Sequence, residues 1–227
     1  FFSSRRRHTR YISVTGVQRV LFRSNYLKEV YAHVRAAGGL CIADEVQTGF
    51  GRTGEHYWGF QNWGVVPDMV TMAKSLGNGA PIAAVTTRAD IAKCMVGKTH
   101  FNTFGGNPVS AAAGLAVLDI IDEDGLQANT KARGAQFRAG LAKLQQSYKL
   151  IGDVRGMGLM IGIELVSDRA TREAARGPAA DVLEATKEMG LLIGKGGLDG
   201  NVLRLKPPMC ITAEDRSEEH TSELQSH

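Results

Sequence analysis

Two short apolar runs near the middle of the chain each stop abruptly at charged residues. The first run, Leu40 to Ala43, ends on Asp44 and Glu45, and the second, Met69 to Ala73, ends on Lys74. Apolar runs of this length, flanked by Gly or Pro, are typical of buried β-strands. Ligands of open α/β sheets bind just beyond the carboxyl ends of the strands. Two neighbouring strands would therefore deliver an acid and a lysine to one crevice.

The rest of the pattern alternates between helical and strand-like segments. Helical periodicity or composition covers residues 26–37, 89–96, 109–121, 126–146 and 181–189. Strands are predicted at 82–86, within 154–165, at 191–194 and at 202–205. Asn107 followed by Pro108 is a cap residue and a first-turn proline, which together favour a helix start. This alternation predicts an α/β protein.

The character of the chain changes near Gly125, where an Ala-rich helix gives way to a charged amphipathic one. We therefore predict two domains, residues 25–125 and residues 126–215. The two ends, 1–24 and 216–227, are interpreted as non-native extensions. VTGVQRVLFRS and RSEEHTSELQSH resemble translated sequencing adapters, and such segments are left out of fold reasoning. The alternative for the first end is a basic arm, because SRRRHTR could bind nucleic acid or begin a transit peptide.

The net charge of +4 comes from the two ends of the chain. Residues 1–24 hold six arginines and no acid, and residues 216–227 hold one arginine and three glutamates, so the remainder carries 20 basic and 20 acidic side chains. The pI of about 9.0 is thus no argument for a nucleic-acid or membrane partner. No stretch approaches the ~20 apolar residues of a membrane helix. Three distant cysteines suit a reducing compartment better than disulfides.

The segment around the two charged strand ends resembles a family signature. DEVQTGFGRTG spans residues 44–54, and Pro67-Asp68 precedes a lysine that is followed by SLGNG. This combination resembles class III aminotransferases, which are pyridoxal phosphate enzymes of fold type I. The resemblance continues through HFNTFGGNP (100–108), IGDVRGMGLMIGIEL (151–165) and LRLKPPMC (203–210). It implies a large domain with a mostly parallel sheet, present in part, and a small, truncated α+β C-terminal domain.

The resemblance assigns roles to the lysine and to one acid. Lys74 is similar to the lysine that forms the Schiff base with pyridoxal 5'-phosphate and then moves the substrate proton. Asp44 is similar to the carboxylate that keeps the pyridine nitrogen protonated. Strand alternation sends Asp44 and Glu45 to opposite faces, so only one meets the ring, and the resemblance selects Asp44. A solvated lysine and a satisfied surface acid are the alternatives.

Four further residues receive roles from the same resemblance. Val46 resembles a residue that packs on the ring, and Gln47 one that hydrogen-bonds its phenolic oxygen. Thr103 resembles a threonine that reaches the cofactor phosphate of a neighbouring subunit, which implies a homodimer or larger assembly with shared sites. Arg204 resembles the arginine that grips the substrate carboxylate. The alternatives are a core valine, a turn threonine and an exposed strand arginine, and spacing alone does not choose between them.

The implied activity is transfer of an amino group from an amino acid to a 2-oxo acid. Within the class, the chain is most similar to the mitochondrial-type alanine–glyoxylate aminotransferases, which suggests alanine, glyoxylate and a mitochondrial location. Alternatives are 4-aminobutyrate, β-alanine or ornithine transamination, an aminomutase or a decarboxylase. Family members carry an N-terminal part that completes the cofactor pocket and that nothing here matches. A non-catalytic fragment is therefore also considered, and the chain alone is expected to be weakly active or inactive.

Two glycine-rich segments and the histidines are set aside. GMGLMIG (156–162) is followed by apolar strand-like residues rather than a helix, so it lacks the context of a dinucleotide-binding loop. GKGGLDGN (194–201) lacks the Lys-Ser/Thr ending of a phosphate-binding P-loop. His33, His56 and His100 are scattered, and no metal site is predicted.

Overall fold

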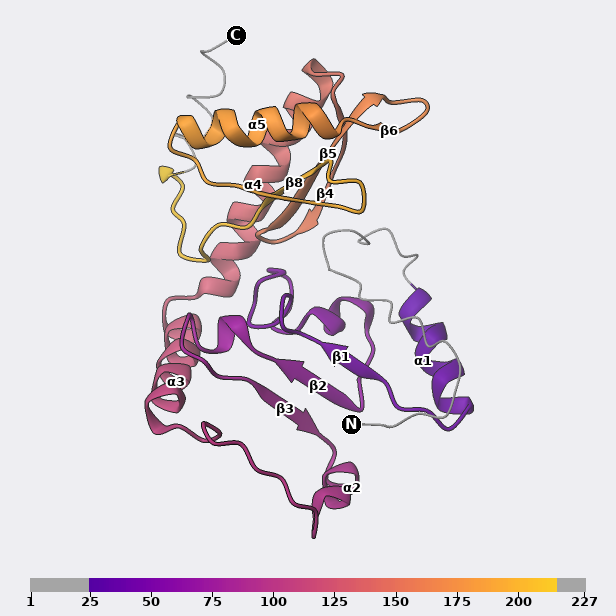
Figure 1. The fold of residues 1–227 in the computed structure, drawn as a ribbon, viewed down its shortest axis with the longest axis vertical. Coiled ribbons are helices and arrows are strands. Elements are labelled where there is room, and N and C mark those ends of the chain that lie inside the picture. Colours follow the sequence, from indigo (N-terminus) through magenta and orange to yellow (C-terminus); the bar gives the residue numbers. More distant parts are fainter. Residues whose placement is uncertain (1–24, 216–227) are drawn as a thin grey trace.

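Two β-sheets and the helices that flank them form the framework of the protein, seen in a computed structural model that describes residues 25–215 (Figure 1). The first sheet has three strands in the order β1-β2-β3, and the second has the order β4-β5-β8-β7 with β6 added at β5. Both are formed from consecutive parts of the chain. The adapter-like extensions expected at 1–24 and 216–227 lie outside the described residues.

The first sheet contains the two apolar runs as neighbours. β1 (Ile42–Asp44) pairs in parallel with β2 (Met69–Met72), and β2 pairs antiparallel with β3 (Ala84–Thr87). The first strand lies two residues later than its apolar run suggests, and it is not buried on both faces. Cys41 and Ala43 are buried whereas Ile42 is 56% exposed, because only one face of β1 is packed by other described residues.

Three helices flank this sheet. They are α1 (Tyr26–Ala36), the short α2 (Ala89–Ala92), which continues as a 3-10 turn, and α3 (Pro108–Glu123). The predicted start of α3 is confirmed, because the Asn107 side chain accepts hydrogen bonds from the amides of Val109 (3.0 Å) and Ser110 (3.1 Å). These bonds satisfy two of the donors that a helix start leaves free.

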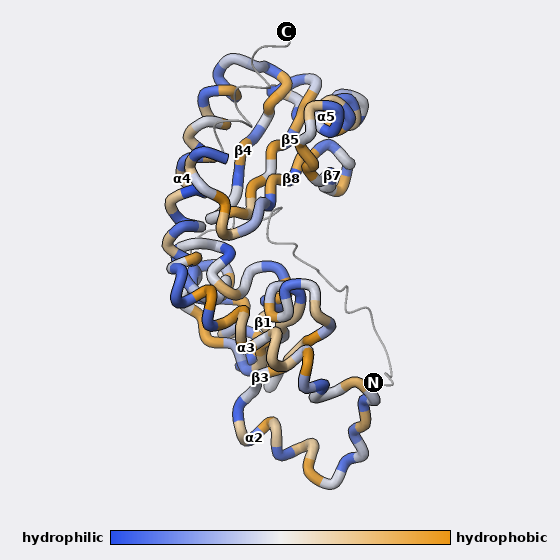
Figure 2. Tube along the Cα trace, turned by 90° about the vertical axis from the view of Figure 1, so that its left-hand side faces the viewer, coloured by the Kyte–Doolittle hydropathy of each residue, from blue (hydrophilic) through white to orange (hydrophobic). Residues whose placement is uncertain are grey.

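The long helix α4 (Leu126–Ser147) connects the two sheets (Figures 1 and 2). It follows α3 after Gly125, whose φ of 60° allows the sharp change in direction. Leu126 packs against the core of the first sheet, formed by Phe50, Met72, Leu76 and Ile121. Phe137 and Leu141, further along α4, lie in the core of the second sheet. The helix therefore contributes to both cores.

The second sheet forms from a long hairpin and two later strands. The hairpin is β4 (Ile151–Met157) and β5 (Met160–Asp168), and β8 (Val202–Leu205) pairs antiparallel with β5. The remaining elements are the two-residue β6 (Glu173–Ala174), α5 (Arg176–Glu188) and β7 (Gly194–Gly196). The strand expected at 191–194 was misplaced, and α5 begins five residues before its predicted start. Pro178 falls in the first turn of α5, where a missing N–H is tolerated.

The buried apolar cluster of the second sheet includes Phe137 and Leu141 of α4 and Ala179 of α5. Leu159 and Ile161 have no exposed surface, and Leu165 and Ala179 are also buried in this cluster. Full burial of a large aliphatic side chain contributes roughly 1.5–3 kcal/mol, so this core is a main source of stability for the second half of the chain.

The loop that follows β1 packs closely against the turn between β4 and β5 of the second sheet. Gly158 lies in the turn between β4 and β5, and a Cβ atom at this position would lie 2.5 Å from the Arg52 carbonyl oxygen. On its other side, a Cβ at Gly134 of α4 would lie 2.2 Å from the Gly158 oxygen. The Leu159 amide also donates to the Arg52 oxygen at 3.3 Å. Only glycine allows three backbones to meet this closely.

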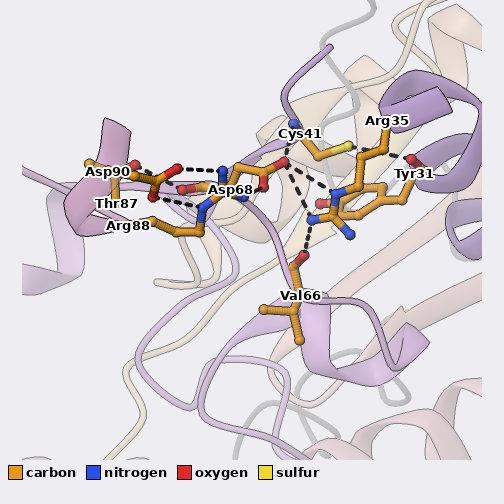
Figure 3. Close-up of polar contacts among 8 residues, drawn as sticks. All are labelled: Tyr31, Arg35, Cys41, Val66, Asp68, Thr87, Arg88 and Asp90. Atoms are coloured by element: carbon orange, nitrogen blue, oxygen red, sulfur yellow. Dashed lines mark hydrogen bonds and ion pairs between the residues drawn. The ribbon is translucent and has the colours of Figure 1, made fainter. Parts of the chain in front are cut away.

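Asp68, buried immediately before β2, holds the opposite end of the first sheet together (Figure 3). Its carboxylate accepts a hydrogen bond from the Cys41 amide at 2.8 Å and forms ion pairs with Arg35, at 3.3 Å, and Arg88. These partners come from α1, the start of β1 and the residue after β3. The Cys41 N–H, followed by the two arginines, lowers the pKa of Asp68. The network lies at the amino ends of β1 and β2 and the carboxyl end of the antiparallel β3, at the opposite edge of the sheet from Lys74.

Replacing Asp68 by asparagine is expected to lower Tm by roughly 5–10 °C near pH 7, because an amide N–H would face the Arg88 guanidinium. The lowered pKa means that the stabilisation by Asp68 is complete above about pH 4 and is lost as pH falls through the folded-state value. Thermal unfolding across pH 2–7 measures this. The control is Asp90→Asn, since Asp90 is 67% exposed. Equal effects of the two substitutions would contradict the prediction.

Candidate active site

The carboxyl ends of β1 and β2 bring the acid and the lysine to the same edge of the sheet. In the parallel register Ile42 lies opposite Met69 and Asp44 opposite Thr71, so Lys74 follows three residues beyond the partner of Asp44. The Glu45 amide extends this ladder by donating to the Thr71 oxygen at 2.9 Å. The expectation that the two runs form neighbouring strands is confirmed, and both strands end at the same edge of the sheet.

Glu45 and Asp44 have different surroundings. Glu45 is 3% exposed, and its carboxylate accepts hydrogen bonds from the amides of Gly59 and Phe60, both at 2.8 Å, and from the Thr48 hydroxyl at 2.7 Å. It thereby holds the loop that follows β1. Asp44 is exposed, and within residues 25–215 its carboxylate accepts a hydrogen bond from the Val46 amide alone, at 3.1 Å. Strand alternation left either acid available and the family resemblance selected Asp44, which is the acid whose carboxylate the described fold does not bury.

Lys74 has an unusual backbone conformation. Its φ is 41°, in the left-handed region that residues other than glycine seldom adopt, and it opens a 3-10 turn whose amides at Gly77 and Asn78 donate to its carbonyl oxygen. Such strain persists where surrounding structure imposes it and is concentrated at functional sites. The Lys74 side chain is exposed beyond the edge of the first sheet.

A pocket of about 530 Å³ lies where the second sheet meets the loop after β1. Gln47 contributes to its wall from that loop, and Arg204 of β8 contributes from the sheet. The structure thus brings together two predicted site residues that are 157 positions apart in the chain. Its apolar wall includes Met160, Ile161, Ile193, Val202, Leu205 and Pro207.

Two glycines of β7 leave room for the Arg204 side chain, which lies against their backbone. Gly194 pairs with Arg204, and a Cβ at Gly194 would lie 3.3 Å from the guanidinium Nη2. A Cβ at Gly196 would lie 3.2 Å from Cδ and Nε of the same arginine. Among the described residues the Arg204 side chain has no hydrogen bond or ion pair, so its donors remain available to a ligand.

Lys206 and Arg52 were not identified from the sequence and are part of the same region. The Lys206 ammonium donates a hydrogen bond to Gln47 Oε1, and Arg52 donates to the Pro207 oxygen at 2.6 Å. Partial burial of the Lys206 ammonium, together with the charges of Arg52, Lys74 and Arg204, lowers the pKa of Lys206 to about 8. The alternation of β8 was the available signal, because it puts residues 204 and 206 on one side.

The structure does not place Thr103 or Val46 in this pocket. Thr103 is exposed, and its side chain makes no hydrogen bond within residues 25–215. Val46 is half-buried directly after Asp44. Arg155, interpreted as structural, forms ion pairs with Asp153 at 2.8 Å and with Glu164. Residues 25–215 contain no group of three or more potential metal ligands, and no helix there is long and apolar enough to cross a membrane.

The arrangement can be compared with known proteins. The family model for class-III aminotransferases matches residues 16–226, so the chain belongs to the class-III aminotransferase family. Solved structures of similar fold include an Arthrobacter phospholyase in complex with phosphoethanolamine, with a TM-score of 0.83 and 42% identity over 88% of this chain and 48% of that one. A Bacillus anthracis aminotransferase has a TM-score of 0.80 and 37% identity, with the same coverage.

Sequence relatives include two alanine–glyoxylate aminotransferases and a phospho-lyase homolog. The chain is 51% identical to alanine–glyoxylate aminotransferase 2 homolog 2, mitochondrial, of Arabidopsis thaliana, over 84% of this chain and 40% of that protein. It is also 51% identical to human alanine–glyoxylate aminotransferase 2, mitochondrial, over 88% and 39%. Ethanolamine-phosphate phospho-lyase homolog 1 of Caenorhabditis elegans is 45% identical, over 82% and 41%. The chain spans about 40% of the length of these relatives.

Proposed function

We propose that the protein is a pyridoxal phosphate-dependent aminotransferase that moves an amino group from an amino acid, with alanine the best match, to a 2-oxo acid such as glyoxylate. The observation that carries the proposal is the placement of Asp44 and Lys74 at adjacent parallel strand ends, with the Arg204 pocket on the second sheet. The two relatives at 51% identity support the choice of substrates. The proposed location is the mitochondrion, by the same resemblance.

The donor set fits this cofactor. When bound, pyridoxal phosphate supplies an electron-accepting ring that stabilises a carbanion at the substrate α-carbon. Asp44 has a carboxylate oxygen free to accept a hydrogen bond from a protonated ring nitrogen. Lys74 provides the amine for covalent attachment and, once released, carries the proton to and from the substrate carbon.

Gln47 and Val46 are proposed to orient the ring. Lys206 occupies the only acceptor of the Gln47 carboxamide, so its N–H₂ group is left to donate to the phenolic oxygen. Val46 would pack on the ring face. Thr103, which is exposed and has no side-chain hydrogen bond to residues 25–215, is proposed to reach the cofactor phosphate of a neighbouring copy, so that the active unit is at least a homodimer.

Arg204 is proposed to bind the substrate carboxylate. Its guanidinium has no ion pair with any residue of the described range, is flanked by the space above Gly194 and Gly196, and faces a pocket with an apolar wall. A planar, permanently charged fork suits bidentate binding of a carboxylate. Because donor and acceptor both carry an α-carboxylate, one arginine can serve both halves of a ping-pong reaction.

A second candidate function is elimination of phosphate from a phosphorylated amine. The identity of 45% to a phospho-lyase homolog and the likeness to the Arthrobacter phospholyase favour this candidate. A second cation, Lys206, in the pocket also suits a phosphate. Other class III transaminations and a chain that is non-catalytic by itself remain alternatives to be separated by assay.

The test is to incubate full-length protein with pyridoxal phosphate, record the visible spectrum, reduce with borohydride and map the labelled peptide. We expect a visible band, a label on Lys74, and alanine-dependent conversion of glyoxylate to glycine. Phosphate release from phosphoethanolamine without transamination would instead establish the lyase. A colourless protein, or a label on another lysine, would overturn both candidates.

A further inference from the structure

Arg204 and Lys206 form a pair of cations on one face of the second sheet's edge. They are two positions apart at the end of β8, and both are exposed, whereas Leu203 is buried and Leu205 half-buried. Alternate strand residues point to the same side and lie roughly 6–7 Å apart. Both residues line the 530 Å³ pocket, so two positive charges face one cavity.

No acid balances these charges within the pocket. Among the described residues, the pocket wall contains no aspartate or glutamate. Arg52, the third cation near Lys206, donates through Nη1 to the Pro207 oxygen at 2.6 Å and faces no acid there, and Arg204 makes no side-chain bond to the described residues. A cluster of cations without counter-charges raises the local concentration of anions and favours their binding.

The Gln47 contact fixes where the Lys206 ammonium lies. One of its three N–H donors reaches Oε1 of Gln47, which also lines the pocket, and among the described residues the other two have no partner. Partial burial of Lys206, followed by the positive charges of Arg52, Lys74 and Arg204, lowers its pKa to about 8. A bound anion would offset the repulsion between these charges.

We propose that Lys206 forms a second anion subsite beside Arg204, so that the pocket accepts, in addition to alanine, amino substrates carrying two negative charges and binds these more tightly. The proposal rests on the function proposed above and specifies its substrate class. The second charge can be a side-chain carboxylate or a phosphate ester, and the shared chemistry is a dianion that spans or bridges the two cations. Alanine then fills only the Arg204 half of the pocket.

Calorimetric titration of full-length holoprotein with three unreactive probes tests the subsite. The probes are propionate, succinate and ethyl phosphate, and we expect at least one dianion to bind roughly tenfold more tightly than propionate, the gain of one charge-assisted hydrogen bond. Succinate as the preferred probe identifies a second carboxylate, and ethyl phosphate a phosphate ester. The preference should decline as pH rises through about 8, where Lys206 loses its charge.

In Lys206→Met the dianions should bind about as tightly as propionate. Lys206→Arg should retain most of the dianion preference. The matched control is Lys195→Met, because Lys195 lies on β7 with its side chain exposed and outside the pocket wall. A wild-type ratio near one, binding of none of the probes, or an equal loss for all three in Lys206→Met would overturn the proposal. Failure of the proposed function is read separately, from the visible spectrum and alanine turnover.

Discussion

Replacing Lys74 by alanine is expected to remove the Schiff-base absorption band of bound cofactor, leaving that of the free aldehyde, and to lower kcat by at least about 10³-fold. Lys74 is proposed to provide both the covalent link and the proton carrier, and loss of a positioned acid–base group alone costs about 10²–10⁴-fold. Its strained φ of 41° points to a position that the fold holds in place. Spectra and single-turnover rates with alanine measure the two losses.

The control for this change is Lys98→Ala. Lys98 is exposed and lies 24 positions further along the chain, and its removal should leave the spectrum and the turnover unaltered. Addition of methylamine to Lys74→Ala should restore part of the proton transfer, because a free amine can occupy the space of the missing group. A Lys74→Ala protein that turns over alanine at the wild-type rate would refute the assignment.

Replacing Arg204 by glutamine is expected to raise KM for both the amino donor and the 2-oxo acid by roughly 10- to 100-fold, with a smaller effect on kcat. The reason is the loss of a charge-assisted, bidentate contact, which contributes about 1.5–3 kcal/mol. Steady-state kinetics with alanine and glyoxylate measure the change. Arg204→Lys should recover only part of the affinity, since a single ammonium does not match the geometry of a carboxylate.

A donor amine without a carboxylate distinguishes loss of carboxylate binding by Arg204 from a general disturbance of the fold. With 1-phenylethylamine as donor, Arg204→Gln should react as fast as the wild type or faster, because no carboxylate needs the guanidinium. An equal loss of rate for alanine and for this amine would show that Arg204 supports the fold of the second sheet rather than the substrate.

Local patterns predicted that the first-sheet strands exist and placed β2 correctly, whereas β1 and β3 begin two residues later than predicted. The run at 69–72 and the alternation at Asp44 and Glu45 predicted a strand and two opposed acids, and the structure has both. The Asn107-Pro108 pair predicted a helix start that the capping bonds confirm. These features depend on side-chain periodicity and on the capping of one helix end. Residues that are neighbours in the sequence are sufficient to define both.

Local patterns were weaker where glycine and polar residues dominate. The strand predicted at 191–194 lies instead at 194–196, in a segment whose glycines have no side-chain pattern to detect. Its position is set by pairing with β8 and by the space that Arg204 needs. The start of α5 was missed because Gly177 and Pro178 resemble loop residues, although both are compatible with a first helical turn.

By itself, the sequence determined the class of the chain, the two charged strand ends and the identity of the lysine and the acids beside them. Only the tertiary structure decided which acid is free, because the three hydrogen bonds that occupy Glu45 come from a loop whose path no periodicity encodes. The same holds for Gln47 and Lys206, which are 159 positions apart and meet in one pocket. Periodicity reports which face a residue occupies on its own element, whereas a site depends on which elements pack together.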